Sequence, residues 1–343
     1  MNLEGSREID CLFCVSETIK TPLPYNYIQE LREVICSAEA TSFKDWKWAQ
    51  EAGDAISLGK SGGDWYEVTS ENINFEDPNC VWRKRIIPKG KIYQGLKLYK
   101  DRSVLEMWCP ANAVALYVKL ELPLRTSQVR WLDSGEADFW RYEAENWVHN
   151  SHSLAKKCGR HIHQQGVFRR VPLSSETDSV STYLYINTNK THDIGKAGPD
   201  KGYIMPWTNQ GELHEQAFFW LEKLRNWQEK YNPIVQRTSW TELDGRHIAA
   251  KSDVQLAGYP ETCFLFRQRE ARRDEQHLPI SQQSLNICWS RLLGALETRL
   301  AARGETHSNG MLIQLLPDIN DRSVVQTTLF PLHSLRVSLI TAL

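Results

Sequence analysis

The sequence predicts an α+β protein, mostly helical with a small antiparallel β-sheet. Apolar residues recur at three- and four-residue spacing in two long segments, and one other segment alternates in the manner of a strand. The helical spacing joins Leu213 to Trp227 and Leu285 to Leu300. With 343 residues, 41% of them hydrophobic, the chain can form one large domain or two ordinary ones with a substantial core.

Prolines and glycines mark where the expected helices end. Pro110 to Leu122 has the Ala, Leu and Lys content of a buried helix and stops before Pro123, which disfavours helical backbone in the residue before it. The helix of residues 213–227 is expected to stop near Pro233, and that of residues 285–300 is closed by Gly304. Within the polar first 75 residues, a helix is expected around residues 27–40.

The strand signal lies in the middle of the chain. From Thr182 to Thr188, two tyrosines and an asparagine alternate with Leu184, Ile186 and Thr188, which is typical of a strand. Residues 202–207 are a suitable partner strand. The residues between them include Gly195, Gly198 and Pro199. We therefore expect a hairpin with a long loop.

Composition excludes several classes of protein. No apolar run is long enough to cross a bilayer, and the N-terminus has no basic end followed by an apolar stretch, so a secretory signal is not expected. The 8 cysteines are scattered, which favours reduced thiols in a cytoplasm. Cys158, His161 and His163 are irregularly spaced with no evident fourth ligand, so a metal site is not expected.

Two basic patches stand out against a net charge of −1. A solvated surface explains either patch as well as DNA binding does, but local concentration of cations is what binds phosphate. The predicted DNA-binding residues of the first patch are Arg83, Lys84, Arg85, Lys89 and Lys91, and those of the second are Lys156, Lys157, Arg169 and Arg170.

The last fourteen residues contain a His-x-x-Arg motif. If Pro331 opens a helix there, Leu332, Leu335, Leu339 and Leu343 form its buried stripe. His333 and Arg336 then share another face near the helix start. A guanidinium donates to two phosphate oxygens at once and an imidazole can transfer a proton, so this face suits a phosphate.

Residues 122–135, Leu-Pro-Leu-Arg-Thr-Ser-Gln-Val-Arg-Trp-Leu-Asp-Ser-Gly, present Arg125 directly after a helix. This segment resembles the first-arginine box of the tyrosine recombinases, or phage integrases. The terminal motif resembles their second box, and Lys190 stands where the family hairpin carries a lysine. The three signatures occur in family order, and the chain resembles the longer recombinase-like proteins of bacterial mobile elements more than it resembles compact phage integrases.

The resemblance implies a mostly helical recombinase catalytic core that cuts and rejoins double-stranded DNA without a cofactor. Arg125 and Arg336 would stabilise the charge of the attacked phosphate, Lys190 would be the general acid, and His333 would assist proton transfer. A tyrosine would form the covalent DNA bond. Other recombinase protomers on the DNA are further expected partners, and a membrane is not.

Several departures leave alternatives open. The last tyrosine, Tyr259, precedes the second box, so we expect the chain to be incomplete at its C-terminus and to lack the nucleophile. Lys196 and Lys201 rival Lys190 as the acid. A non-catalytic DNA-binding remnant, or a tyrosine supplied by another protomer, are the other interpretations; a metal-dependent nuclease would need an acidic cluster that the sequence lacks. We expect an N-terminal region of uncertain fold over residues 1–95, and a catalytic domain over residues 96–343.

Overall fold

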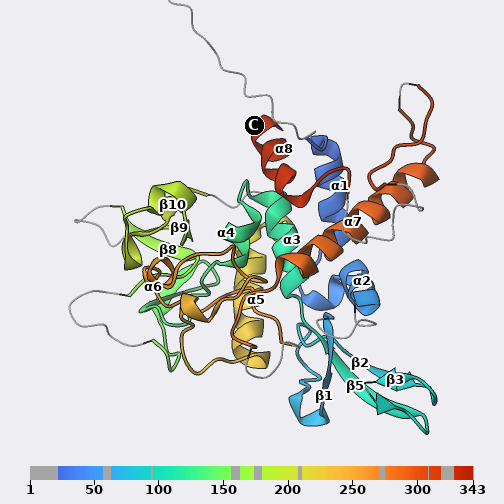
Figure 1. The fold of residues 1–343 in the computed structure, drawn as a ribbon, viewed down its shortest axis with the longest axis horizontal. Coiled ribbons are helices and arrows are strands. Elements are labelled where there is room, and N and C mark those ends of the chain that lie inside the picture. Colours follow the sequence, from blue (N-terminus) through green and yellow to red (C-terminus); the bar gives the residue numbers. More distant parts are fainter. Residues whose placement is uncertain are drawn as a thin grey trace, which may run out of the picture.

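The computed structural model describes residues 22–56, 63–93, 96–155, 163–173, 180–207, 211–269, 275–307, 309–317 and 328–342. Helices and small antiparallel sheets share the chain, which confirms the predicted α+β class (Figure 1). The α-helices are α1 (Tyr25–Ile35), α2 (Lys47–Ile56), α3 (Ala111–Glu121), α4 (Thr126–Arg130), α5 (Ala217–Tyr231), α6 (Asp253–Ala257), α7 (Gln282–Ala302) and α8 (Leu335–Ala342). None of the helices in these ranges is long and apolar enough to cross a membrane.

The strands form small antiparallel sheets. One sheet has the order β1-β5-β2, a second the order β10-β9-β8, and two further pairs are β3-β4 and β6-β7. Their bounds are β1 (Trp65–Val68), β2 (Trp82–Ile87), β3 (Ile92–Tyr93), β4 (Leu96–Lys97), β5 (Arg102–Trp108), β6 (Trp140–Glu143), β7 (Asn146–His149), β8 (Phe168–Pro172), β9 (Val180–Ile186) and β10 (Tyr203–Met205).

Helix α3 lies at the centre of the main core. Every residue from Ala111 to Leu120 is buried, because α1, α4, α5, α7 and α8 all contact this helix (Figure 1). Burial of each leucine or valine of α3 contributes about 1.5–3 kcal/mol. The central helix therefore gives a rigid base to whatever follows its C-terminus.

The expected helices occur, with shifted ends. Helix α5 begins at Ala217, because Leu213 lies in a separate 3-10 turn and is exposed. The segment at residues 110–122 is α3, and α7 ends just before Gly304, whose φ of +69° is the left-handed conformation that closes helices. The N-terminal helix is shorter than expected, since Cys36 is already extended after Ile35. Leu332, Leu335 and Leu339 are buried as expected, while Leu343 lies outside the described residues.

The expected hairpin is also confirmed, with β9 antiparallel to β10 and Ile186 opposite Tyr203. Gly202 has a φ of +86°, and a Cβ at this position would lie 2.2 Å from the carbonyl oxygen of Ile186. Only glycine fits this close approach.

A second hairpin was not expected. Strands β2 to β5 form it, and it extends away from the helices at the lower right of Figure 1. The predicted boundary between residues 95 and 96 falls between β3 and β4 at its tip, so a division there would separate paired strands. Residues from both predicted domains also share the main core.

Candidate functional site

Arg125 follows helix α3 on a segment that is hydrogen-bonded to a buried lysine of that helix. Leu122 ends the helix in extended conformation, and the buried ammonium of Lys119 donates to the carbonyl oxygen of Leu124 at 2.5 Å. Arg125 is itself extended and precedes α4. Its guanidinium is half-buried and forms no ion pair within the described ranges, so it remains available to an anion.

Gln128 connects this segment to the hairpin. Its side-chain oxygen accepts from the backbone N–H of Arg125 at 3.0 Å, and its amide donates to the carbonyl oxygen of Thr188 at 2.9 Å. Gln128 is only 3% exposed, so both bonds are protected from water. The backbone of Lys190, two residues beyond Thr188, is thereby fixed relative to Arg125; the side chain of Lys190 lies outside the described part.

The loop between β9 and β10 is organised by Asp193. Its carboxylate accepts from the backbone N–H groups of Asn189, at 2.5 Å, and Gly202, at 3.0 Å. Its carbonyl oxygen accepts from the ammonium of Lys201 at 3.0 Å. Lys201 is 7% exposed and is occupied within the loop, whereas Lys196 is exposed to solvent.

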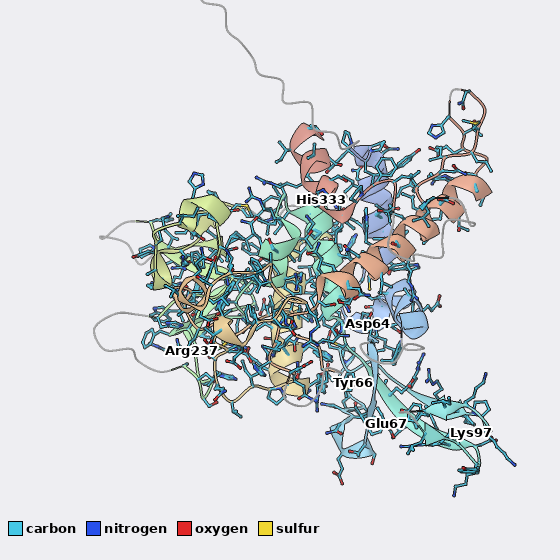
Figure 2. All side chains as sticks on the ribbon, in the orientation of Figure 1. Asp64, Tyr66, Glu67, Lys97, Arg237 and His333 are labelled. Carbon is cyan, nitrogen blue, oxygen red and sulfur yellow. The ribbon has the colours of Figure 1, made fainter. Side chains whose placement is uncertain are left out.

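His333 and Arg336 lie on two successive elements, the 3-10 turn η8 (Leu332–Ser334) and helix α8. His333 is exposed at the surface (Figure 2). Arg336 is half-buried, and its Nε atom is buried without a hydrogen-bond partner. Burial, followed by the charge of Arg336, lowers the pKa of Lys119 to about 7. Arg336 therefore lies near the same ammonium that supports the segment of Arg125.

Two adjoining pockets bring the two boxes together. A pocket of about 680 Å³ is lined by Arg125, and one of about 220 Å³ is lined by His333. Gln282 lines both, and Thr126, the neighbour of Arg125, lines the smaller one. The larger volume falls in the range of small-ligand sites. Segments more than 200 residues apart in the sequence thus meet at the end of α3.

The larger pocket contains residues that the sequence did not predict to be part of the site. Lys251 and Tyr259 line it together with Arg125. The ring of Tyr259 stacks on Trp240 at 4.1 Å, and the ammonium of Lys201 lies 4.6 Å from the ring centre. Both contacts fix the ring. No sequence motif marks Tyr259, because it reaches the pocket only through the fold of residues 240–264.

Arg130, the other arginine of the first box, has a structural role. It is 2% exposed and donates to the carbonyl oxygens of Ile280 at 2.7 Å and His247 at 3.0 Å. Arg130 therefore connects α4 to the later part of the chain. Of the two arginines in this box, Arg125 is the more exposed and is the better candidate to bind a phosphate.

The acidic residues that follow the first box form a buried polar cluster. Asp133 accepts from the backbone N–H groups of Gly135 and Cys263, and Asp138 from those of Gln165 and Gly166. Burial raises the pKa of both carboxyls, which the proximity of the two groups reinforces at Asp133. Glu136 pairs with Arg267 through bonds of 2.7 and 2.8 Å, and both side chains are fully buried.

These acids cross-link the fold and do not form a metal centre. No group of three or more His, Cys, Asp or Glu side chains suited to a metal ion occurs within the ranges that the structure describes. Cys158 and His161 lie outside those ranges, and His163 lies 3.8 Å from Asp138.

The first basic patch divides into two kinds of cation. Arg83 and Arg85 pair with the buried carboxylate of Glu106, at 2.7 and 3.4 Å. The predicted lysines of this patch, in contrast, are exposed on the β2–β5 hairpin and in no described ion pair: Lys84, Lys89 and Lys91. Only the lysines therefore retain free charge.

The second basic patch contains two half-buried arginines. The guanidinium of Arg169 lies 3.8 Å from the ring centre of Tyr185, and that of Arg170 lies 4.8 Å from the ring of Trp140. Burial lowers the pKa of Arg169. Lys156 and Lys157 lie outside the described residues.

Comparison with known proteins identifies a family for this chain. The family model Integrase_2, described as "Putative integrase", matches residues 6–241, more than half of the chain. The chain belongs to this integrase family. No curated protein and no solved structure matches it. Integration or recombination of DNA is therefore the general function of this integrase, with DNA as its partner.

The match includes Arg125, Lys190 and the β2–β5 hairpin, and it includes most of the N-terminal region to which the sequence alone gave no role. His333 and Arg336 lie beyond its end. Their connection to the integrase site thus depends on the adjoining pockets and on the position of Arg336 beside Lys119.

Proposed function

We propose that this integrase carries the phosphate-binding part of a tyrosine-recombinase site, and that Arg125 and Arg336 bind one DNA phosphate between them. The observation that carries the proposal is the meeting of the two arginine-bearing segments at the end of α3, with neither guanidinium paired to a described carboxylate. Attack on a phosphodiester concentrates negative charge on its non-bridging oxygens, which two guanidinium groups stabilise.

The remaining groups would move protons. A tyrosine hydroxyl loses its proton and attacks phosphorus, the bond from phosphorus to the 5′ oxygen breaks, and a 3′-phosphotyrosyl bond forms. Lys190 donates a proton to the departing 5′ oxygen, and His333 orients the phosphate and assists proton transfer. The reaction reverses when the 5′ hydroxyl of another strand attacks, so no cofactor is required.

The test combines this chain with a protomer that contains the tyrosine but lacks the first arginine. On DNA carrying the recombination site, the mixture is expected to form a covalent DNA–protein adduct. Arg336→Ala in the present chain should lower the rate by about two to three orders of magnitude, as for loss of a transition-state donor. Arg303→Ala is the matched control, because Arg303 already pairs with Glu30 and Glu305. Equal rates for both variants would remove Arg336 from the site.

The role of Lys190 has a separate test. A DNA substrate with sulfur in place of the bridging 5′ oxygen releases a leaving group that needs no proton. This substrate should restore cleavage to Lys190→Ala and leave Arg336→Ala impaired. Restoration in Lys196→Ala instead would assign the acid to Lys196.

A second candidate is a DNA-binding protein without catalytic activity. It would occupy DNA sites in the bacterial cytoplasm or act as a partner of a complete recombinase. The exposed lysines of the β2–β5 hairpin, which belong to no described ion pair, favour it, because they can bind DNA without any strand cleavage. DNA binding with no adduct in the mixture, in the presence of a tyrosine-containing protomer shown to be folded, would select this candidate.

A further inference from the structure

The β2–β5 hairpin, here called the arm and comprising residues 82–93 and 96–108, projects from the body of the molecule (Figure 1). Its base is a regular ladder, with Trp82 opposite Met107 and Ile87 opposite Arg102. Backbone bonds from Gly90 to Leu98 and from Leu98 to Lys91 continue the pairing toward β3 and β4. Strand β1 pairs with β5 at the base from Leu105 to Trp108, so the arm is a two-stranded ribbon only beyond that base.

The distal part of the arm exposes large apolar side chains. Ile92 is 75% exposed, Leu96 is 72% exposed and Tyr99 is 84% exposed. A two-stranded ribbon is marginally stable alone, and clustered apolar surface on a projecting element indicates a binding surface.

The arm is also cationic. Lys89, Lys91, Lys97 and Lys100 are exposed and belong to no described ion pair, and Asp101 is the acid among them. The arginines of the arm are occupied nearer its base, Arg102 by Glu67 at 2.7 Å. The unpaired charge is therefore concentrated on the lysines toward the tip.

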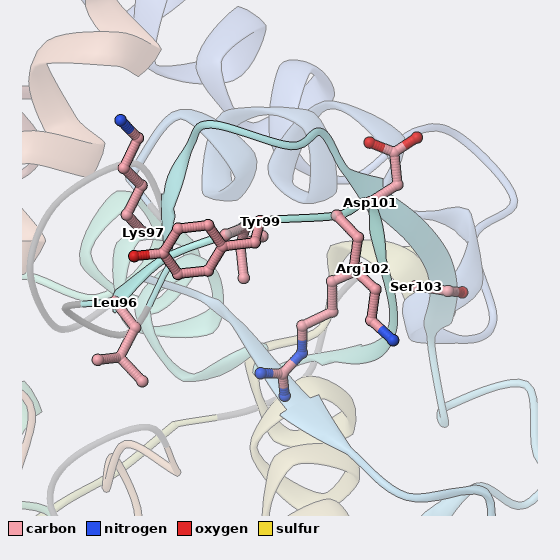
Figure 3. Close-up of a pocket in the computed structure, with 8 residues that line it drawn as sticks. Leu96, Lys97, Tyr99, Asp101, Arg102 and Ser103 are labelled. Atoms are coloured by element: carbon pink, nitrogen blue, oxygen red, sulfur yellow. The ribbon is translucent and has the colours of Figure 1, made fainter.

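Cations and apolar groups occur on both faces of the tip. Ile92 lies opposite Lys97, and Tyr93 lies opposite Leu96, so each pair shares a face. Lys91 alternates with Ile92 and thus lies on the face opposite Lys97. Figure 3 shows the same alternation, with Lys97 and Leu96 extending from opposite sides of the hairpin. A ribbon charged on both faces fits a slot with two anionic walls better than a flat surface.

We propose that the arm enters a groove of duplex DNA, with Lys91 and Lys97 against the phosphates of the two walls and Ile92 and Leu96 against the base edges. The major groove, about 12 Å wide, admits a two-stranded ribbon. Apolar side chains contact thymine methyl groups or wedge between base steps. The inference rests on the DNA partner of the integrase family and is independent of the strand-cleavage chemistry.

The test is fluorescence anisotropy of a labelled mixed-sequence duplex, titrated with the full chain over a series of salt concentrations. Lys91→Gln/Lys97→Gln should lower the slope of log affinity against log salt by about 1.8, at about 0.9 for each phosphate contact. Ile92→Ser/Leu96→Ser should leave the slope unchanged and weaken binding about tenfold at every salt concentration. Lys44→Gln/Lys47→Gln, two exposed lysines on the body, should change neither quantity.

Binding to heparin, a polyanion without base edges, distinguishes insertion into a DNA groove from general attraction to negative charge. The lysine variant should weaken heparin binding as well, and the apolar variant should not. An unchanged salt slope in the lysine variant, or equal losses in both lysine variants, would overturn the inference. So would an apolar variant that keeps its DNA affinity but changes oligomeric state, which would mark the tip as a protein contact. Absence of any duplex binding by the unmodified chain would instead contradict the DNA-binding function.

Discussion

Arginines in the interior of this integrase and arginines at its proposed phosphate site have opposite surroundings. Arg267 is fully buried and matched by both carboxylate oxygens of Glu136. Arg125 and Arg336 are half-buried and have no described carboxylate partner. A buried cation without a partner is costly, so Arg267 is completed by the fold itself. The difference separates cations that hold the protein together from cations left free for an anionic ligand.

The largest expected effect comes from Arg267→Ala, which leaves Glu136 buried without its partner. The free energy of unfolding should fall by about 3–5 kcal/mol, measured by urea denaturation. Arg125→Ala should change it by less than about 0.5 kcal/mol. Comparable losses of unfolding free energy in the two variants would show that Arg125 and Arg267 both stabilise the fold, which would contradict the comparison. Arg267→Met/Glu136→Leu, which removes both charges, should recover most of the stability.

Gln128→Ala tests whether the unpaired Arg125 depends on a buried residue that positions it. It removes the acceptor of the part-buried Arg125 backbone N–H and the donor to the buried carbonyl oxygen of Thr188. The free energy of unfolding should fall by about 1–3 kcal/mol. DNA-adduct formation should fall as well, since Arg125 and Lys190 lose their connection. An active variant with reduced stability would show that Gln128 serves the fold alone.

A pH dependence follows from Lys119. Burial and the charge of Arg336 lower its pKa in the folded protein to about 7, below the value of about 10.4 for an unfolded lysine. Between these values the unfolded chain binds more protons, so this residue makes stability rise with pH, by at most about 1.4 kcal/mol per pH unit. The free energy of unfolding is measured against pH for the unmodified protein and for Lys119→Met. The unmodified protein should show this rise between pH 7 and 10, and the variant should lack it. Parallel curves from pH 7 to 10 would contradict the assignment.

The smallest effect is expected at Arg83. Arg83 is partly exposed, and the buried carboxylate of Glu106 keeps Arg85 as a partner when Arg83 is replaced, so the free energy of unfolding should fall by about 1 kcal/mol or less. Arg83→Gln should also leave the salt dependence of DNA binding unchanged, because the guanidinium is directed to Glu106. A loss of slope comparable to that of the arm lysines would place Arg83 on DNA.

Local sequence signals predicted much of the fold. Pro123 and Gly304 mark the ends of α3 and α7, and alternation at residues 182–188 identifies β9, because each depends on neighbouring residues alone. The arm could not be recognised in this way: its outer side chains are exposed on both faces, so no clear apolar alternation marks β3 and β4.

The site was predictable to the extent that motifs define it. Arg125, His333 and Arg336 were named from their boxes, and they lie on segments that adjoin. Lys119, Gln128 and Tyr259 required three-dimensional contacts. Likewise, sequence counts Arg83 and Arg85 as free cations, since Glu106 is distant along the chain and adjacent only across the sheet.

The central claim is that Arg125 and Arg336 bind the same phosphate. A double-mutant cycle with inorganic phosphate as the probe tests it most directly, by the rise in melting temperature that bound phosphate produces. If the claim holds, Arg125→Gln and Arg336→Gln each remove most of the rise, and combining them adds little. If the two losses are small and simply add, the arginines act at separate places and the proposed site is contradicted.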